Sequence, residues 1–422
     1  MIIKRNGDKV PYDKDKVFIA VEKAFKEVYP NESTNTKKSK KIADYVDAMI
    51  QNSEKEDISV EEIQDMVEDI LMIKNKPVAK AYIRYRYKRQ MARNKYNEMM
   101  SLVEEKLTAS NVQNQNANVD EESFGGRMGE MADLVAKNYA LDYLMSEKAK
   151  QNHLQNRIYT HDLGSYAIGN HNCLTVPFDR LLAEGFNTRQ TDVRPANSVN
   201  TAFQLVAVLF QLQSLQQFGG VAASHIDWTM IPYVRKSFYK HWKDGMKYLN
   251  NVTKFNDDIF TDKLSITDEK YLHPKNAYDY AMDMTVKETY QAVEGLYHNL
   301  NTLQSRSGNQ LPFTSINYGT CTEPEGRLVI KAILETSIKG VGRLHKTSVF
   351  PCGIFKLKTG VNRKPGDPNY DLFQLALKST AQRLYPNYSN CDWSGNAGYN
   401  PNNPEEEFST MGKCKCSSSK TF

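Results

Sequence analysis

The stretch from Ser110 to Glu122 contains few apolar side chains and consists mainly of Asn, Gln, Asp and Glu. Such a stretch cannot bury enough apolar surface to offset the entropy that it would lose on ordering. It therefore predicts a linker or an exposed loop. Because it divides the chain, we expect two domains, a shorter front segment and a longer rear segment, each with its own core.

The front segment, residues 1–95, has the pattern of a small and mostly helical domain. The apolar pair Ile2-Ile3, a turn containing Gly7 and the return residue Val10 predict a short hairpin. A helix should follow, because a single apolar face is formed by Val17, Ala20, Val21, Ala24, Phe25 and Val28.

Two further helices are expected in the front segment. Ser59 and Glu62 have the spacing of a capping box, in which each residue satisfies a free N–H group at the helix start. Pro77 favours the first turn of a last helix that continues through Tyr85.

The rear segment, residues 123–412, alternates helical and β-rich patterns. Alternation of this kind favours an α/β domain with a helix-wrapped sheet or barrel. The pair Gly219-Gly220 indicates a break between helices or a close approach of two backbones. We expect helices at 205–215 and 372–384, and strands at 313–318 and 349–357.

Composition excludes several classes of protein. The 422 residues, 40% of them hydrophobic, can form a large core, and the net charge of +5 is spread along the chain. That charge suits small phosphate-bearing ligands and indicates no nucleic-acid partner.

No signal peptide or apolar run of about 20 residues is present, so we expect a cytoplasmic protein with no membrane partner. No CxxC pair is present, so we expect no metal site and reduced thiols at Cys173, Cys321, Cys352, Cys391, Cys414 and Cys416.

Four cations gather where the expected hairpin meets the first helix. Lys4, Arg5 and Lys9 lie within the hairpin, and Lys16 follows it in the helix. A helix N-terminus presents free N–H groups and a partial positive charge, so this arrangement suits a triphosphate. A solvated basic surface would contain the same residues.

Blocks at both ends of the front segment carry a resemblance: Ile3-Lys4-Arg5-Asn6-Gly7 with Lys9-Val10-Pro11-Tyr12-Asp13, and Ala79-Lys80-Ala81-Tyr82-Ile83-Arg84-Tyr85-Arg86. They resemble the ATP-cone, the regulatory module at the front of many ribonucleotide reductases. The resemblance implies that ATP permits activity and that dATP suppresses it. It also implies phosphate contacts from Lys4, Arg5, Lys9 and Lys80, with Lys16 as a further residue of the allosteric site.

A series of blocks along the rear segment carries a second resemblance: Ser123-Phe124-Gly125-Gly126-Arg127, Tyr159-Thr160-His161-Asp162-Leu163, His171-Asn172-Cys173-Leu174, Arg194-Pro195-Ala196-Asn197-Ser198-Val199-Asn200-Thr201-Ala202, Gln217-Phe218-Gly219-Gly220, Phe350-Pro351-Cys352-Gly353-Ile354-Phe355 and Gly366-Asp367-Pro368-Asn369-Tyr370-Asp371. In order and spacing they resemble the anaerobic (class III) ribonucleoside-triphosphate reductases. The expected fold is therefore α/β: a mostly helical ATP-cone at 1–95, a connecting helix and polar linker at 96–122, and the first part of a ten-stranded glycyl-radical-type barrel at 123–412.

The family removes the 2′-hydroxyl of a ribonucleotide by radical chemistry, because an ordinary side chain cannot abstract the 3′-hydrogen. The resemblance implies a thiyl radical on one cysteine, formed from a stored glycyl radical. A second cysteine and formate then complete the reduction. Cys173 matches that second cysteine. A buried small hydrophobe is the alternative role for a single cysteine.

Polar residues in a Pro-led turn form a candidate substrate site. The hydroxyl, amide and backbone N–H groups of Asn197, Ser198 and Thr201 suit ribose and phosphate, and they also suit a helix cap. The two roles are compatible. His161 beside Asp162 suits an oriented imidazole at the substrate, or a core histidine.

The resemblance ends after the block Ser409–Gly412. In the family this block is followed by the cysteine that carries the thiyl radical, whereas Lys413 stands here and Cys414 lies one place late. Residues 413–422 resemble nothing in the family, as after a frameshift or an interrupted gene. The zinc site and the glycyl-radical loop of the family are expected beyond Phe422, so we expect a truncated and inactive chain.

Together these patterns predict an oxidoreductase that binds nucleoside triphosphates and makes deoxyribonucleotides under allosteric control by ATP and dATP. For the full-length family the resemblance implies a radical-SAM activating enzyme and a homodimer. One alternative is a non-catalytic nucleotide-binding regulatory or interaction fragment. Another is a different glycyl-radical enzyme, such as a formate-lyase relative, which the front segment and the block Arg194–Ser198 disfavour.

Overall fold

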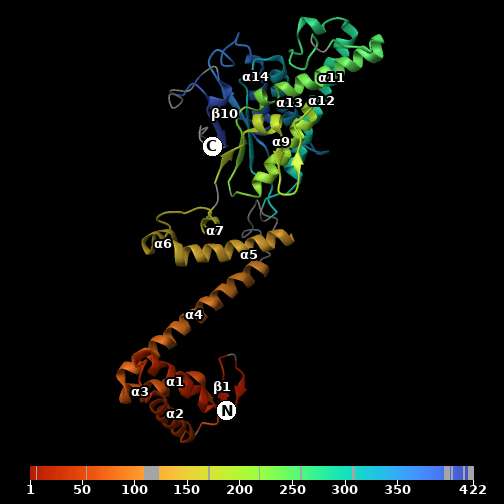
Figure 1. The fold of residues 1–422 in the computed structure, drawn as a ribbon. Coiled ribbons are helices and arrows are strands. Elements are labelled where there is room, and N and C mark those ends of the chain that lie inside the picture. The colour runs from red at the N-terminus through yellow and green to blue at the C-terminus, as the bar shows by residue number, and fades with distance from the viewer. Residues whose placement is uncertain are drawn as a thin grey trace. The chain divides into compact units, whose positions relative to one another are not determined.

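The computed structural model describes residues 1–5, 7–53, 55–107, 123–169, 172–217, 219–256, 259–306, 309–393, 400 and 403–410, and the backbone alone of 108, 411 and 414–416. The chain divides into two compact units, Met1–Glu105 and Lys106–Phe422 (Figure 1). The expected linker at 110–122 lies outside the described residues, as do Lys413 and residues 417–422 of the expected tail.

The first unit combines a three-stranded sheet with helices. The sheet has the order β2-β1-β3, in which β1 is antiparallel to β2 and parallel to β3. Its elements are β1 (Ile2–Ile3), β2 (Lys9–Val10), α1 (Lys14–Val28), α2 (Asn35–Gln51), β3 (Ile58–Ser59), α3 (Val60–Lys74) and α4 (Lys76–Thr108), the last of which continues past the boundary of the unit.

Local chemistry accounts for most of these elements. Gly7 has a φ of +87°, which a glycine adopts without strain, and the expected hairpin is confirmed. Asp13 caps the N-terminus of α1, and the helix ends before Tyr29. The capping box of Ser59 and Glu62 is present at the start of α3, as the spacing predicted.

Helix α2 has no counterpart among the expected helices. Its buried residues do share one face, with helical spacing, but the two that begin the series are polar: Asn35, Ser39, Ile42, Ala43 and Val46. A lysine-rich first half therefore hides the apolar periodicity that would have revealed the helix.

Helix α4 closes the core of the first unit. Its residues Val78, Ala79 and Tyr82 are buried in that core. One turn later, the Arg86 guanidinium lies 2.8 Å from Glu61 and 2.9 Å from Glu68 of α3. Several charges in one network hold these two helices together better than an isolated surface pair would.

Five parallel strands form the sheet of the second unit, in the order β10-β9-β8-β7-β4. Every residue of β7 and β8 is buried, as in parallel sheets whose two faces are covered. The expected α/β class is thereby confirmed. The strands are β4 (Leu174–Thr175), β7 (Val221–Ala223), β8 (Thr314–Tyr318), β9 (Cys352–Leu357) and β10 (Asn387–Asn390).

Helices connect each strand of this sheet to the next, because parallel neighbours need a crossover. The crossovers contain α8 (Phe178–Glu184), α9 (Val199–Ser214), α10 (Ile226–Thr229), α11 (Ile231–Asn250), α12 (Lys275–Thr302), α13 (Pro324–Lys339) and α14 (Tyr370–Arg383). The expected helices correspond to α9 and α14, and the expected strands to β8 and β9. Strand β9 begins only after Pro351, which has no N–H to donate to a ladder.

The remaining elements are shorter or lie outside the sheet. They are α5 (Phe124–Tyr139), a π-helical turn (Ala140–Leu144), α6 (Glu147–Leu154), α7 (Leu163–Tyr166), β5 (Phe186–Asn187), β6 (Asp192–Val193), 3-10 turns at Glu269–Tyr271 and Pro404–Glu406, β11 (Ser409–Met411) and β12 (Cys414–Cys416). Strands β5 and β6 pair antiparallel, and so do β11 and β12.

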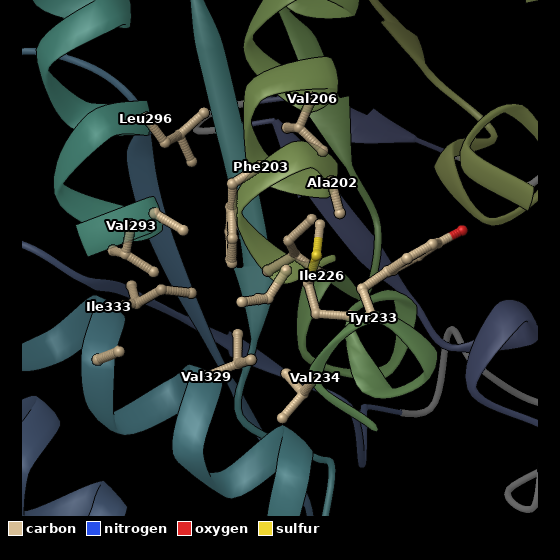
Figure 2. Packing of buried hydrophobic residues seen from close by; sticks show 14 of the residues in the cluster. Ala202, Phe203, Val206, Ile226, Tyr233, Val234, Val293, Leu296, Val329 and Ile333 are labelled. Carbon is tan, nitrogen blue, oxygen red and sulfur yellow. The ribbon is translucent and has the colours of Figure 1, made fainter. Parts of the chain in front are cut away.

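The core of the second unit lies between the sheet and its crossover helices. Figure 2 shows side chains of α9, α12 and α13 converging there, among them Phe203, Leu296 and Ile333. Each of these three is 1% exposed or less. Burial of one such side chain stabilises the fold by roughly 1.5–3 kcal/mol relative to exposure.

The substitution Ser59→Ala removes the side chain that caps α3. We expect the free energy of unfolding of the first unit to fall by about 1 kcal/mol. Thr34→Ala is the matched control, because Thr34 occupies the N-cap of α2 without a capping hydrogen bond; its cost should stay below about 0.5 kcal/mol. Hydrogen exchange of core amides in the full chain measures both, and equal losses would contradict the prediction.

Candidate functional site

A cavity of about 220 Å³ lies in the first unit, where the β1–β2 hairpin meets α1, α3 and α4. Aliphatic side chains such as Ile2, Val17 and Ile63 form most of its wall. Polar groups reach it from Lys4, Tyr12, Lys16 and Gln64, among others. Apolar walls with a few convergent polar groups are the usual composition of a small-molecule site.

Tyr12 lines this cavity, and its hydroxyl is buried and has no hydrogen-bond partner among the described residues. Burial raises the pKa of Tyr12 to about 12, and the charge of Asp47 acts in the same direction. The hydroxyl therefore keeps its proton at neutral pH and remains a donor. Buried polar groups without a partner are rare in folded proteins, so this one is suited to a ligand atom.

The α1 N-terminus, which we expected to offer free N–H groups to phosphate, already holds a carboxylate. Asp13 accepts a hydrogen bond from the Asp15 N–H at 3.0 Å. The Lys16 ammonium lies 3.7 Å from the Asp13 carboxylate and remains 75% exposed. The helix end is thus partly occupied, and the positive charge at the cavity comes from Lys4 and Lys16.

The other three expected phosphate contacts do not line the cavity. Arg5 ties the hairpin to α3, with its Nε 2.5 Å from Glu61. Lys9 forms an ion pair with Asp57. Lys80 is exposed on α4, about 200° around the helix axis from Tyr82, which lines the cavity. The fold thus brings Lys4 and Lys16 together at the cavity and leaves Arg5, Lys9 and Lys80 outside it.

Sequence reasoning from charge alone missed Tyr12, Gln64 and Tyr82 as cavity residues. Both tyrosines lie inside the blocks that resemble the ATP-cone. Their place in those blocks was the available signal. Gln64 lies in the middle of α3, and its sequence context gives no such signal.

In the second unit Cys173 directly precedes β4, the strand at one edge of the sheet. It therefore lies at the end of the sheet where the parallel strands begin. Its sulfur accepts a hydrogen bond from the Gly220 N–H at 3.4 Å. A Cβ atom at Gly219 would lie 1.7 Å from the Asn172 carbonyl oxygen, so the expected close approach of backbones is confirmed. The two segments hold the half-buried thiol in place.

Arg306 is a buried cation near Cys173 that the sequence analysis missed. It is 6% exposed, and its guanidinium carbon lies 3.9 Å from the centre of the Phe313 ring. Burial lowers the pKa of Arg306 to about 10, opposed by the charges of Asp162 and Cys173. The guanidinium therefore stays charged at neutral pH and contributes to the electrostatic environment of the thiol. The sequence gives no signal of this position near the thiol, because Arg306 is a single arginine in a polar loop.

His161 and Asp162 contact each other through His161 Nδ1 and a carboxylate oxygen, so the imidazole is oriented. The His161 side chain is 67% exposed, which excludes the alternative of a core histidine. Asp162 itself has a φ of +59° and occupies the N-cap of α7.

The polar turn before α9 forms a helix cap. The Ser198 hydroxyl accepts a hydrogen bond from the Thr201 N–H at 3.1 Å and donates one to the Thr201 hydroxyl, also at 3.1 Å. Asn197 is exposed. The capping alternative is therefore confirmed for Ser198, and its oxygen is already in use within the protein.

Cys414 begins β12 and pairs with Met411 of β11 in an antiparallel register. Its side chain lies outside the described residues. Among the described residues, no three His, Cys, Asp or Glu side chains are grouped so that they could hold a metal ion. No helix among the residues that the structure describes is long and apolar enough to cross a membrane.

Two family models match the chain. The model for anaerobic ribonucleoside-triphosphate reductase matches residues 115–420, and the ATP-cone domain model matches residues 1–91. The chain is 32% identical to the anaerobic ribonucleoside-triphosphate reductases of Haemophilus influenzae and Escherichia coli, over 93% of its own length and 52% and 51% of theirs. The chain thus spans about half the length of these curated relatives.

Among solved structures, the chain is similar to the anaerobic ribonucleotide reductase of Thermotoga maritima in complex with dATP and CTP. The TM-score is 0.45 at 12% identity, with 71% of this chain and 50% of that chain covered.

Gly219→Ala tests the close approach that positions Cys173. The new methyl group would overlap the Asn172 carbonyl, so we expect the second unit to lose about 1–3 kcal/mol of unfolding free energy. Gly295→Ala is the control: nothing lies within 4 Å of its Cβ position on α12, and alanine there should stabilise the helix by up to about 1 kcal/mol. Denaturant unfolding of the full chain measures both changes. Equal effects would show that Gly219 is not constrained by its neighbour.

Proposed function

The chain belongs to the anaerobic ribonucleoside-triphosphate reductase family, and on that premise we propose that it combines a nucleotide-binding regulatory domain with part of a ribonucleotide-reducing centre. The first unit would bind ATP and dATP as allosteric effectors. The second would contribute Cys173 to the reduction of a nucleoside triphosphate.

The observation that best supports nucleotide binding is the cavity with a buried, unpartnered Tyr12 hydroxyl and two lysines. A purine base would occupy the apolar part and offer ring nitrogen atoms as acceptors for that hydroxyl. The phosphates would then lie toward Lys4 and Lys16. Arg5 and Lys9 would join them by exchanging Glu61 and Asp57 for phosphate oxygens.

For the reduction, the chain's own residues would hold a thiol and a ribose. The Cys173 thiol is held by the Gly220 N–H, and the Arg306 guanidinium is close enough to act on its charge. Asn197, Thr201 and His161 are proposed to contact the substrate, with Ser198 holding the turn in shape. A glycyl radical would supply the unpaired electron, and formate the reducing electrons. An activating radical-SAM enzyme and a homodimer belong to the same proposal.

We infer further that this chain does not complete the reaction by itself. At the position where the family resemblance places the radical-bearing cysteine, Lys413 offers an ammonium group that cannot form a thiyl radical. Cys414 stands one residue later. A displacement of one residue is several times the ~1 Å misplacement that already costs roughly a hundredfold in rate, so we infer that Cys414 does not substitute for that cysteine. This observation favours a second function, a nucleotide-binding regulatory chain without catalysis.

Nucleotide binding can be tested by charge reversal at the cavity. We expect Lys16→Glu in the full chain to weaken ATP and dATP binding at least about tenfold, because it places like charge against phosphate. Lys40→Glu is the control, since Lys40 is exposed on α2 and does not line the cavity; it should leave affinity within about twofold. Isothermal titration calorimetry decides: no binding by the unmodified chain, or equal losses in both variants, would refute the site.

Turnover is the second test. We expect no deoxyribonucleotide from the purified chain supplied with activating enzyme, formate and a ribonucleoside triphosphate without oxygen, because position 413 lacks a thiol. The Escherichia coli relative, treated in the same way, is the positive control. Chromatography of the nucleotide products measures the outcome. Product from a preparation shown to be free of any longer reductase would contradict the inference.

A further inference from the structure

Glu407 is a buried acid whose carboxylate is held by two separate parts of the second unit, the loop after β8 and the end of β9. It follows the 3-10 turn Pro404–Glu406, stands just before β11, and is 3% exposed. Its carboxylate accepts hydrogen bonds from the Thr320 hydroxyl at 2.8 Å, from Lys356 at 3.3 Å and from Lys358 at 2.9 Å. We call these four residues the Glu407 cluster.

The Glu407 cluster is stabilised by charge. Lys356 lies within β9 and is fully buried, so its ammonium depends on partners inside the protein. Burial alone would raise the pKa of Glu407, but Lys356 and Lys358 outweigh it and the pKa is lowered. The carboxylate is therefore ionised at neutral pH. If Glu407 became neutral, Lys356 would lose a buried counter-charge, which folded proteins tolerate poorly.

A second contact holds the chain three residues later. Asn317, fully buried and next to last in β8, donates a hydrogen bond to the Thr410 carbonyl at 2.9 Å and accepts one from the Thr410 N–H at 3.1 Å. The same amide also donates to the Ala223 carbonyl of β7 at 2.9 Å. The Asn317 side chain thus forms with Thr410 the pair of hydrogen bonds that the backbone of a neighbouring strand would form. It joins β11 to β7 and β8.

We propose that Glu407 and Asn317 are positioning residues. The Glu407 cluster ties the chain just before β11 to the loop after β8 and to the end of β9. Three residues later, the Asn317 amide ties β11 itself to β8 and β7. The contacts themselves are independent of any activity. Their consequence rests on the proposed function, because β11 leads directly to position 413, where the family resemblance places the radical-bearing cysteine. A thiol there would be held in place by a charge cluster at one end of the strand.

A role in simple space-filling is the competing explanation. Glutamine has nearly the shape of glutamate and still accepts the Thr320 hydrogen bond, so a packing role would be undisturbed by Glu407→Gln. A role that depends on charge would be lost, because Lys356 and Lys358 would face a neutral amide. The isosteric substitution therefore separates the two explanations.

Hydrogen–deuterium exchange of the full chain tests the proposal. We expect Glu407→Gln to raise the exchange rate of amides 408–411 at least about tenfold, with amides of α12 and α13 unchanged. Glu405→Gln is the matched control, since Glu405 is exposed on the same 3-10 turn; its rates should stay within about twofold of the original. Unchanged rates at 408–411 in Glu407→Gln, or a rise spread evenly over the second unit, would overturn the proposal.

A milder variant keeps the test decisive if Glu407→Gln does not fold. Thr320→Val keeps the shape and removes the hydroxyl that donates to Glu407 at 2.8 Å and accepts from the Trp228 indole N–H at 3.2 Å. We expect a local rise of about threefold at the same amides. No change there would overturn the proposal. Hydrogen–deuterium exchange is measured without nucleotide or activating enzyme. A failure of nucleotide binding would therefore not affect this result, and a failure of this test would not affect the test of nucleotide binding.

Discussion

Every residue of β8 is buried, so each polar group on that strand must find its partner inside the protein. The backbone pairs with β7 on one side and β9 on the other. The Asn317 amide, one residue before the end of the strand, bonds to both β7 and β11. The Thr314 hydroxyl is an exception, with no hydrogen-bond partner among the described residues. The placement of three other strands therefore depends on the polar groups of this one.

The same constraint governs the loop that leaves β8. A single buried carboxylate oxygen of Asp227 accepts hydrogen bonds from the N–H groups of Gly319, Thr320 and Cys321, at 2.9–3.1 Å. Burial raises the pKa of Asp227, although these N–H groups act against it. Because the loop is tied down in this way, the Thr320 hydroxyl faces Glu407. The Glu407 cluster is thus a consequence of how the chain satisfies the end of its most buried strand.

The candidate sites of the two units differ in how their polar groups are satisfied. In the first unit the Tyr12 hydroxyl has no described partner beside a cavity, and the nearby lysines are exposed. Such groups favour a ligand that arrives from solvent. In the second unit the Cys173 thiol is held by a backbone N–H in a segment that leaves no room for a Cβ at Gly219. Such packing holds the thiol in one position, which would suit the proposed reduction of a bound ribonucleotide.

Local patterns in the sequence were sufficient for the hairpin at Gly7, the capped helix α3, the α/β class and the close approach at Gly219, because each follows from the chemistry of neighbouring residues or from one periodicity. They were not sufficient for α2, whose buried face begins with Asn35 and Ser39, nor for Tyr12 and Arg306, whose roles depend on burial. By itself the sequence thus determined the family and the alternation of elements. Only the tertiary structure decided which cations reach the cavity, and that Asn317 bonds to Thr410, a residue 93 positions away. The physical reason is that periodicity shows which side chains face a core, whereas the partner of a buried polar group is set by contacts between segments far apart in the chain.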